Sequence, residues 1–163
     1  ERGATRRLAH EYAALQRESA DELVTELAPQ SDDLRSWRAV LRPPASGVYG
    51  GGRFELAIDV PDAYPIKPPS MRFHHMYFIE CALEGTRASD MRLTQTGEIC
   101  LDVLQAQWSP AWTLRSACTA ILALLDSPAP DSPLNVDAAN LLRCGDDIAY
   151  RSLCRMYVEL YAK

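Results

Sequence analysis

Hydrophobic and polar residues alternate most regularly in a segment that follows a run of glycines. From Arg53 to Val60, the hydrophobic residues Phe54, Leu56 and Ile58 alternate with charged or small residues. A period of two residues is typical of a strand with one buried face. Shorter runs of strand-forming composition predict three further strands, over Asp21–Leu27, Trp37–Leu41 and Ser70–His74.

Turn-forming residues separate these strands. Tyr49–Gly52 predicts a tight turn, because three consecutive glycines follow the tyrosine. Four prolines fall within Pro61–Pro69, which excludes a helix or a central strand and predicts a stiff loop. Met76–Thr96 has no clear period and is expected to be irregular.

Helical periodicity appears on either side of the predicted strands. Leu8, Tyr12 and Leu15 share one face of a helix that we expect over Arg6–Ser19. A second helix is expected over Thr113–Asp126 and is stopped by the prolines that follow it.

Two more helices are expected towards the C-terminus. The first covers Val136–Arg143, and the second begins after Asp146, whose carboxylate can cap it. The predicted apolar stripe of this last helix consists of Tyr150, Leu153, Tyr157 and Leu160. The order of elements predicts an α+β fold with an N-terminal helix, a four-stranded antiparallel meander, an irregular crossing segment and C-terminal helices.

The composition is typical of one globular domain, which we expect to span residues 1–163. These residues are 47% hydrophobic and 24% charged, with a formal charge of −5. An acidic balance argues against general nucleic-acid binding, which favours a basic surface. No apolar run is long enough to cross a bilayer and no signal-like segment precedes the first helix, so we expect no membrane insertion and a cytoplasmic location.

The cysteines give no sign of a metal site. They number five: Cys81, Cys100, Cys118, Cys144 and Cys154. None has the CxxC or Cys/His spacing of a zinc site, so we expect no metal. Because no secretory signal is seen, we expect the chain to reside in a reducing compartment, where most of its thiols stay free.

Five short motifs occur in a fixed order along the chain. They are Tyr49–Gly51, Tyr64–Pro69, Gly97–Leu104, Trp108–Ala111 and Asp131–Leu134. Each alone is weakly specific, but in this order they resemble the signature of the ubiquitin-conjugating enzymes over nearly the whole chain. The fold of that family agrees with the α+β prediction.

The resemblance implies that Cys100 accepts ubiquitin as a thioester from the activating enzyme and passes it to a lysine or cysteine of a substrate. A thiolate suits both steps, because it is a good nucleophile and a good leaving group. Asp102, Asp131 and Ser132 match positions from which family members orient the attacking group, although such loop residues also serve only as turn caps. The other four cysteines are expected to be buried and structural. No cofactor is implied, since the activating enzyme uses the ATP.

One feature departs from the family pattern. Family members carry His-Pro-Asn upstream of the cysteine, and the asparagine stabilises either the developing oxyanion or the facing loop. Here Asp90-Met91-Arg92 stands at the usual offset, and no asparagine occurs between His74 and Cys100. Arg92, Thr94 and Gln95 are polar candidates to replace it.

The resemblance also implies two binding surfaces. A RING-type ligase would contact the first helix, Pro65 and Ile66, together with Ser109, Pro110 and Ala111. The activating enzyme would contact Arg6 and Arg7 at the basic start of the helix. Plain loop packing and a solvated helix face are the alternative interpretations of these residues.

A C-terminal stretch resembles one branch of the family. Asp131–Asp147 is similar to the peroxisomal, peroxin-4 type members, which implies a membrane-anchored peroxisomal partner and recruitment to the cytosolic face of the peroxisomal membrane. Two alternatives stay open: a non-catalytic scaffold that binds ubiquitin or a ligase, and an enzyme for another ubiquitin-like modifier.

Overall fold

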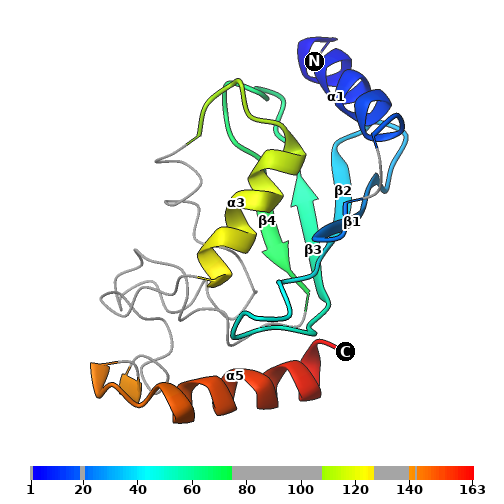
Figure 1. Cartoon of the computed structure of the whole chain (residues 1–163). Coiled ribbons are helices and arrows are strands. Elements are labelled where there is room, and N and C mark those ends of the chain that lie inside the picture. Colours follow the sequence, from blue (N-terminus) through cyan, green and yellow to red (C-terminus); the bar gives the residue numbers. More distant parts are fainter. Residues whose placement is uncertain (1, 19–20, 75–107, 127–139, 142) are drawn as a thin grey trace.

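A computed structural model describes residues 2–18, 21–74, 108–126, 140–141 and 143–163. The elements, in chain order, are α1 (Arg2–Leu15), β1 (Val24–Pro29), β2 (Ser36–Leu41), β3 (Phe54–Asp59), β4 (Ser70–Phe73), α3 (Leu114–Asp126) and α5 (Asp147–Tyr161). The strands form one antiparallel sheet in the order β1-β2-β3-β4 (Figure 1). The predicted α+β architecture with a meander is therefore confirmed.

One face of the sheet carries the core. Ile58 lies between Trp37 on β2 and Met71 on β4, and Leu56 lies between Ala39 and Phe73 in the next row. All six side chains are buried, as are Phe54 and Leu41 beside them. The alternation predicted for Arg53–Val60 places these residues correctly, because side chains two apart point to the same face.

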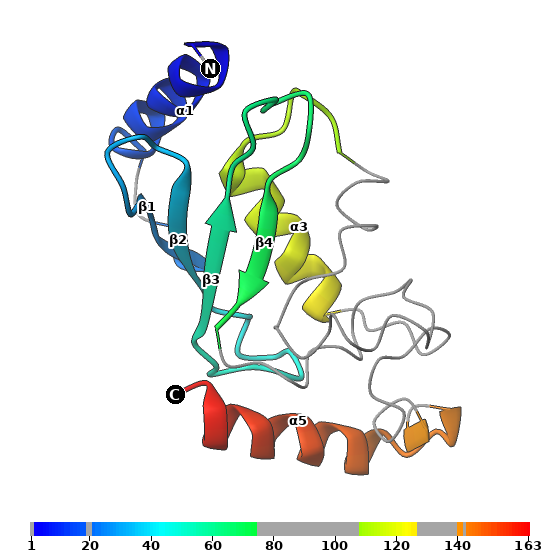
Figure 2. The same cartoon turned by 180° about the vertical axis from the view of Figure 1, so that it is seen from behind.

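Helix α3 covers this face of the sheet, as the two opposite views show (Figures 1 and 2). Its inward side chains Ala117, Cys118, Ile121 and Leu125 have no exposed surface. Helix α1 lies at one end of the sheet and α5 near the other end (Figure 1). The arrangement buries the inward side chains of α3 between the helix and the sheet.

The opposite face of the sheet carries ion pairs. Arg53 and Arg38 both contact the carboxylate of Glu55, and Arg72 pairs with Asp59. Hydrogen bonding to Arg53 is the largest cause that lowers the pKa of Glu55. The alternation of the strands therefore separates an apolar face from a charged one.

Two predicted boundaries were wrong at the N-terminal end. Helix α1 begins at Arg2, four residues earlier than predicted, and Ala4 extends its buried face. Strand β1 begins at Val24 instead of Asp21, because the carboxylate of Asp21 accepts hydrogen bonds from the backbone N–H groups of Leu23 and Val24 and forms a turn.

The last helix, α5, has the predicted N-cap but buries a different face from the one predicted. The side chain of Asp146 accepts a hydrogen bond from the Ala149 N–H, which confirms the N-cap. The predicted stripe was wrong at its end, since Leu160 is 61% exposed while Cys154 and Val158 are buried. The buried face of α5 follows Tyr150, Cys154 and Val158, and Leu160, two residues after Val158, lies on the other side of the helix because each residue turns it by about 100°. The backbone N–H of Arg53, just before β3, donates to the Ala162 carbonyl at 2.6 Å after the helix ends.

Candidate functional site

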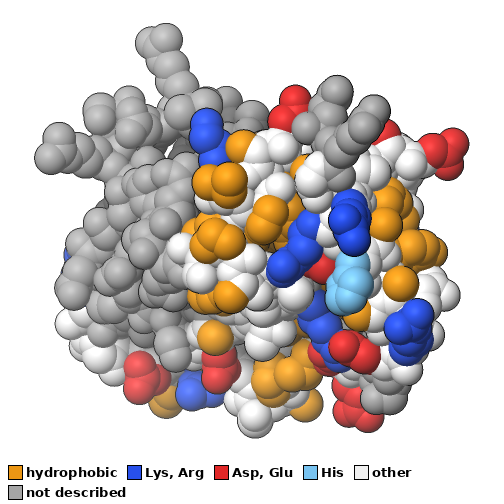
Figure 3. Space-filling model, turned by 90° about the horizontal axis from the view of Figure 1, so that it is seen from above, with side chains coloured by type: hydrophobic (Ala, Val, Ile, Leu, Met, Phe, Trp, Pro, Cys, Tyr) orange, Lys and Arg blue, Asp and Glu red, His pale blue; other side chains and the backbone are white. Residues whose placement is uncertain are grey.

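The residues predicted for chemistry divide into two groups. Those of the predicted catalytic centre, Cys100, Asp102, Asp131 and Ser132, lie outside the described residues, as do Arg92, Thr94 and Gln95. Those predicted to bind partners are all described and come from α1 and from two loops, residues 61–69 and 108–113. We call α1 and these two loops together the helix–loop face (Figure 3).

The two loops of the face are joined to each other. The indole N–H of Trp108 donates to the Pro65 carbonyl at 2.7 Å. The ring of Trp108 also lies 5.9 Å from the ring of Tyr64 and 5.9 Å from that of Trp112, between ring centroids. Aromatic pairs at this spacing each add about 0.5–1.5 kcal/mol beyond burial. The two loops are therefore joined by direct contacts although they are far apart in sequence.

Apolar side chains stand at the tips of both loops. Ile66 is 77% exposed, and Pro110 and Ala111 are exposed on the neighbouring loop. Figure 3 shows hydrophobic side chains gathered beside a row of basic side chains and a histidine. An exposed apolar residue at the tip of a well-held loop is the kind of residue that becomes a binding hot spot, because a partner can bury nearly all of its surface.

A buried carboxylate connects the helix to both loops. Glu11 is 5% exposed, although its neighbours on α1 include several charged residues. It accepts hydrogen bonds from Arg7 Nε at 2.6 Å, the Tyr64 hydroxyl at 2.7 Å and the Leu114 backbone N–H at 2.9 Å. Burial, and next the bond to Glu11, raise the pKa of the Tyr64 phenol. The sequence did not lead us to expect that Glu11 is buried. The one feature that indicates it is the spacing of Glu11, three residues after Leu8 and four before Leu15, which places it on the apolar face of the helix.

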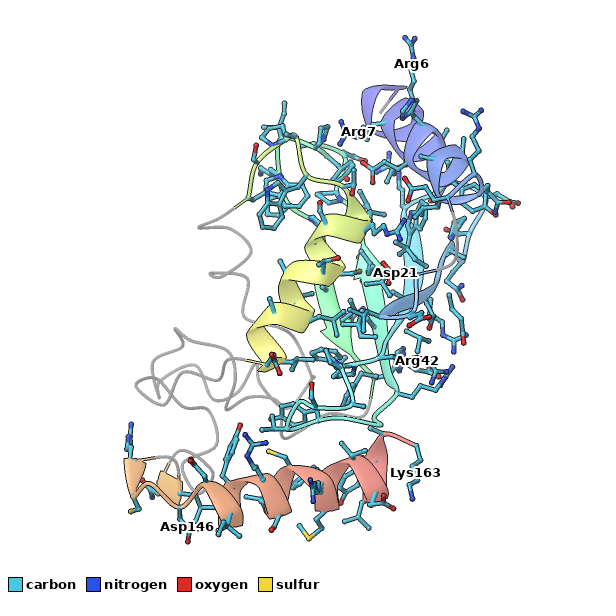
Figure 4. The ribbon with its side chains drawn as sticks, in the orientation of Figure 1. Arg6, Arg7, Asp21, Arg42, Asp146 and Lys163 are labelled. Carbon is cyan, nitrogen blue, oxygen red and sulfur yellow. The ribbon has the colours of Figure 1, made fainter. Side chains whose placement is uncertain are left out.

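The two arginines predicted to bind the activating enzyme have different surroundings. Arg6 is exposed and points away from the molecule, whereas Arg7 points towards the loops (Figure 4). Besides its pair with Glu11, Arg7 donates from Nη2 to the Trp112 carbonyl at 2.9 Å. The hydrogen bond to Glu11 raises the pKa of Arg7 above its ordinary value. Only Arg6 therefore has its whole guanidinium available to a partner.

The described cysteines are of two kinds. Cys118 and Cys154 have no exposed surface, which confirms the prediction of structural thiols. Burial raises the pKa of Cys118 to about 12 and also raises that of Cys154. The prediction was wrong for Cys144, which is exposed, since it lies in a short turn before α5 and not on a packed helix face.

Neither a metal centre nor a membrane span occurs in the described part of the chain. No group of three His, Cys, Asp or Glu side chains there is placed to hold a metal ion. None of the described helices has the length and apolar character that crossing a bilayer requires.

Comparison with known proteins gives a consistent result. Residues 7–158 match the family described as ubiquitin-conjugating enzyme. The chain is 42% identical to Protein PEROXIN-4 of Arabidopsis thaliana, over 96% of this chain and 93% of that protein, and 44% identical to Ubiquitin-conjugating enzyme E2 16 of Schizosaccharomyces pombe, over 97% and 92%. The crystal structure of H. polymorpha Pex4p in complex with the soluble domain of Pex22p is similar, with a TM-score of 0.79, 35% identity and 98% coverage of both chains.

Proposed function

The chain belongs to the ubiquitin-conjugating enzyme family, a family of transferases, and on that basis we propose that it carries ubiquitin on Cys100 and transfers it to a lysine or cysteine of a substrate. The observation that carries the proposal is the family match over residues 7–158, which includes Cys100 and its motif. Identity to curated relatives over more than nine tenths of each chain supports it.

The proposed reaction is two successive acyl transfers. The Cys100 thiolate attacks the carbonyl carbon of the thioester on the activating enzyme, a new C–S bond forms, and the thiolate of that enzyme leaves. A substrate amine or thiol then attacks the new carbonyl carbon, loses one proton to a base or to water, and forms a C–N or C–S bond, while the bond to Cys100 breaks and its thiolate leaves with the electron pair. Asp102, Asp131 and Ser132 would orient the incoming nucleophile. ATP is consumed by the activating enzyme before the first step, so this chain needs no cofactor.

The helix–loop face supports the partner part of the proposal. A RING-type ligase would cover Ile66, Pro65 and the tip at Ser109, Pro110 and Ala111, and the activating enzyme would contact α1 at Arg6 and Arg7. The direct contacts between the two loops favour this role, because a preformed surface loses little conformational freedom on binding.

Peroxisomal action is the finer part of the proposal. A relative named PEROXIN-4, and a Pex4p whose structure holds the soluble domain of Pex22p, support a place in peroxisome biogenesis. We infer that a membrane-anchored partner recruits this chain to the cytosolic face of the peroxisomal membrane. Peroxisomal import receptors are the substrates that this location implies.

A thioester assay tests the chemistry. The chain is incubated with ubiquitin, activating enzyme and ATP and then separated on a non-reducing gel. We expect an adduct that a thiol reductant removes, that Cys100→Ala abolishes, and that Cys100→Ser converts into an ester resistant to reductant. Cys144→Ala, at an exposed cysteine, is the matched control and should charge normally. If no adduct forms while a known conjugating enzyme is charged in parallel, the chain is instead a binding scaffold or serves another modifier.

A further inference from the structure

A single carboxylate, that of Glu11, contacts three segments: α1, the proline-rich loop of the helix–loop face 53 residues later, and the start of α3, directly after the second loop and 103 residues later. Both oxygens are used: Oε1 accepts from Arg7 and Tyr64, and Oε2 accepts from Leu114. The donor–acceptor distances are 2.6 Å from Arg7, 2.7 Å from Tyr64 and 2.9 Å from Leu114, which are short to ordinary for hydrogen bonds to a carboxylate.

We propose that Glu11 is the positioning residue of the helix–loop face, and that its carboxylate sets where both loops stand relative to α1. The proposal deepens the proposed function and depends on it, since it assumes that this face receives the activating enzyme and the ligase. Glu11 itself would touch no partner, because it is almost fully buried.

The contacts show how the effect reaches the surface. Tyr64 directly precedes Pro65 and Ile66, so its hydroxyl fixes the base of the loop that presents the exposed isoleucine. Arg7, held by Glu11, donates to the Trp112 carbonyl in the second loop. A change at the carboxylate therefore moves both loops with respect to the helix.

The charge of Glu11 is required as well as its shape. A glutamine has one acceptor oxygen, and its NH₂ group would face either the Leu114 N–H or the Arg7 Nε–H, both of which are donors. Either the buried Leu114 N–H or the partly exposed Arg7 Nε–H would then lose its acceptor, or the helix would move away from the loops. Glu11→Gln is consequently a change of nearly constant volume that should displace the face.

The tryptophan indole signals in a ¹H–¹⁵N spectrum report the displacement directly. Trp108 and Trp112 lie in the second loop, whereas the ring of Trp37 packs 5.8 Å from that of Tyr12 on α1, between centroids, and would itself respond to a movement of the helix. The reference is therefore the set of backbone N–H signals of β3, which lies between β2 and β4 and donates no hydrogen bond to Glu11. In Glu11→Gln we expect the signals of Trp108 and Trp112 to shift by more than their linewidths while the backbone N–H signals of β3 stay in place. Coincident signals in variant and unsubstituted protein would overturn the proposal.

Charging kinetics test the functional consequence. With fixed activating enzyme, ubiquitin and ATP, we expect Glu11→Gln to raise the half-saturating concentration of the chain about tenfold and to leave the maximal rate within about twofold, since the partner must first bind the displaced face. Glu18→Gln makes the same chemical change at a half-exposed residue whose ion pair with Arg115 lies at the surface, where such pairs contribute little, and should alter neither value. An unchanged half-saturating concentration in Glu11→Gln would overturn the proposal.

A second variant guards against loss of folding. Tyr64→Phe keeps the ring against Trp108 and removes only one donor to Glu11, so smaller shifts in the same direction are expected. A Trp108 signal unmoved in this variant would again contradict the proposal. If the unsubstituted chain is not charged at all, the proposed function fails, and the indole signals alone still decide whether Glu11 positions the loops.

Discussion

Two isoleucines offer a sharp test of whether the tip of the helix–loop face binds or merely packs. Ile66 is 77% exposed, and Ile58 has no exposed surface. Ile66→Ala and Ile58→Ala remove the same atoms from these opposite surroundings. Full burial of an isoleucine contributes about 1.5–3 kcal/mol, so the quarter of Ile66 that is buried accounts for about 0.5 kcal/mol in the free protein. Ile58→Ala should instead cost about 2–5 kcal/mol, because it leaves a cavity in the core.

Binding should reverse the order of the two effects. If a RING domain covers the remaining three quarters of Ile66, truncation forfeits about 1–2 kcal/mol of association free energy, which is about a tenfold weaker complex. Ile58→Ala should bind the RING domain with unchanged affinity under conditions where the variant remains folded. The difference separates a contact residue from a core residue.

Two measurements are needed for each variant. Urea unfolding followed by circular dichroism gives the free energy of unfolding, and RING-stimulated loss of ubiquitin from the charged chain gives the effect on ligase action. If Ile66→Ala lowers the free energy of unfolding by more than about 1 kcal/mol, Ile66 contributes to the packing of the free protein and is not mainly a contact residue. Unchanged ligase stimulation in that variant would place the ligase elsewhere.

Three further predictions follow from the cap, the thiols and the charged face of the sheet. Asp146→Ala should lower the free energy of unfolding by about 1 kcal/mol in urea titrations, since it removes the N-cap of α5. A thiol-alkylating reagent at mild alkaline pH should modify Cys144 and spare Cys118 in the folded chain, as peptide mass spectrometry can show; equal modification would contradict the burial of Cys118 and its pKa of about 12. The hydrogen bond from Arg53 lowers the pKa of Glu55, so the ionised carboxylate stabilises the fold above pH 4.5, and this contribution is lost as the pH falls further. In Arg53→Gln, the free energy of unfolding should therefore change less with pH between about pH 5 and 3, as urea titrations at each pH can show.

Local pattern was sufficient for the sheet and the main helices. The alternation of Phe54, Leu56 and Ile58 predicted which face of β3 is buried, because a strand has a fixed period of two and the core accepts only its apolar side. The helix predicted over Thr113–Asp126 is α3, which begins one residue later, at Leu114, and ends at the same residue. Asp146 was recognised as a cap, since capping involves only residues two or three positions away.

The boundaries were harder to predict, because they depend on competition between local interactions. Asp21 lies in a turn and not in a strand, since its side chain satisfies the backbone N–H groups that a strand partner would otherwise take. Leu160 has the spacing of a core residue from Tyr157, but packing buries the face of α5 that carries Tyr150, Cys154 and Val158, so Leu160 stays exposed.

The sequence by itself determined the order of the elements, the buried face of the central strand and the motifs that mark the family. Only the tertiary structure decided that Glu11 is buried, that Arg7 is held inside the face and that Cys144 is exposed. The physical reason is that a carboxylate can leave water only where donors replace its hydration. For Glu11 the donors on Tyr64 and Leu114 come from distant segments, and folding alone brings them within 3 Å of it.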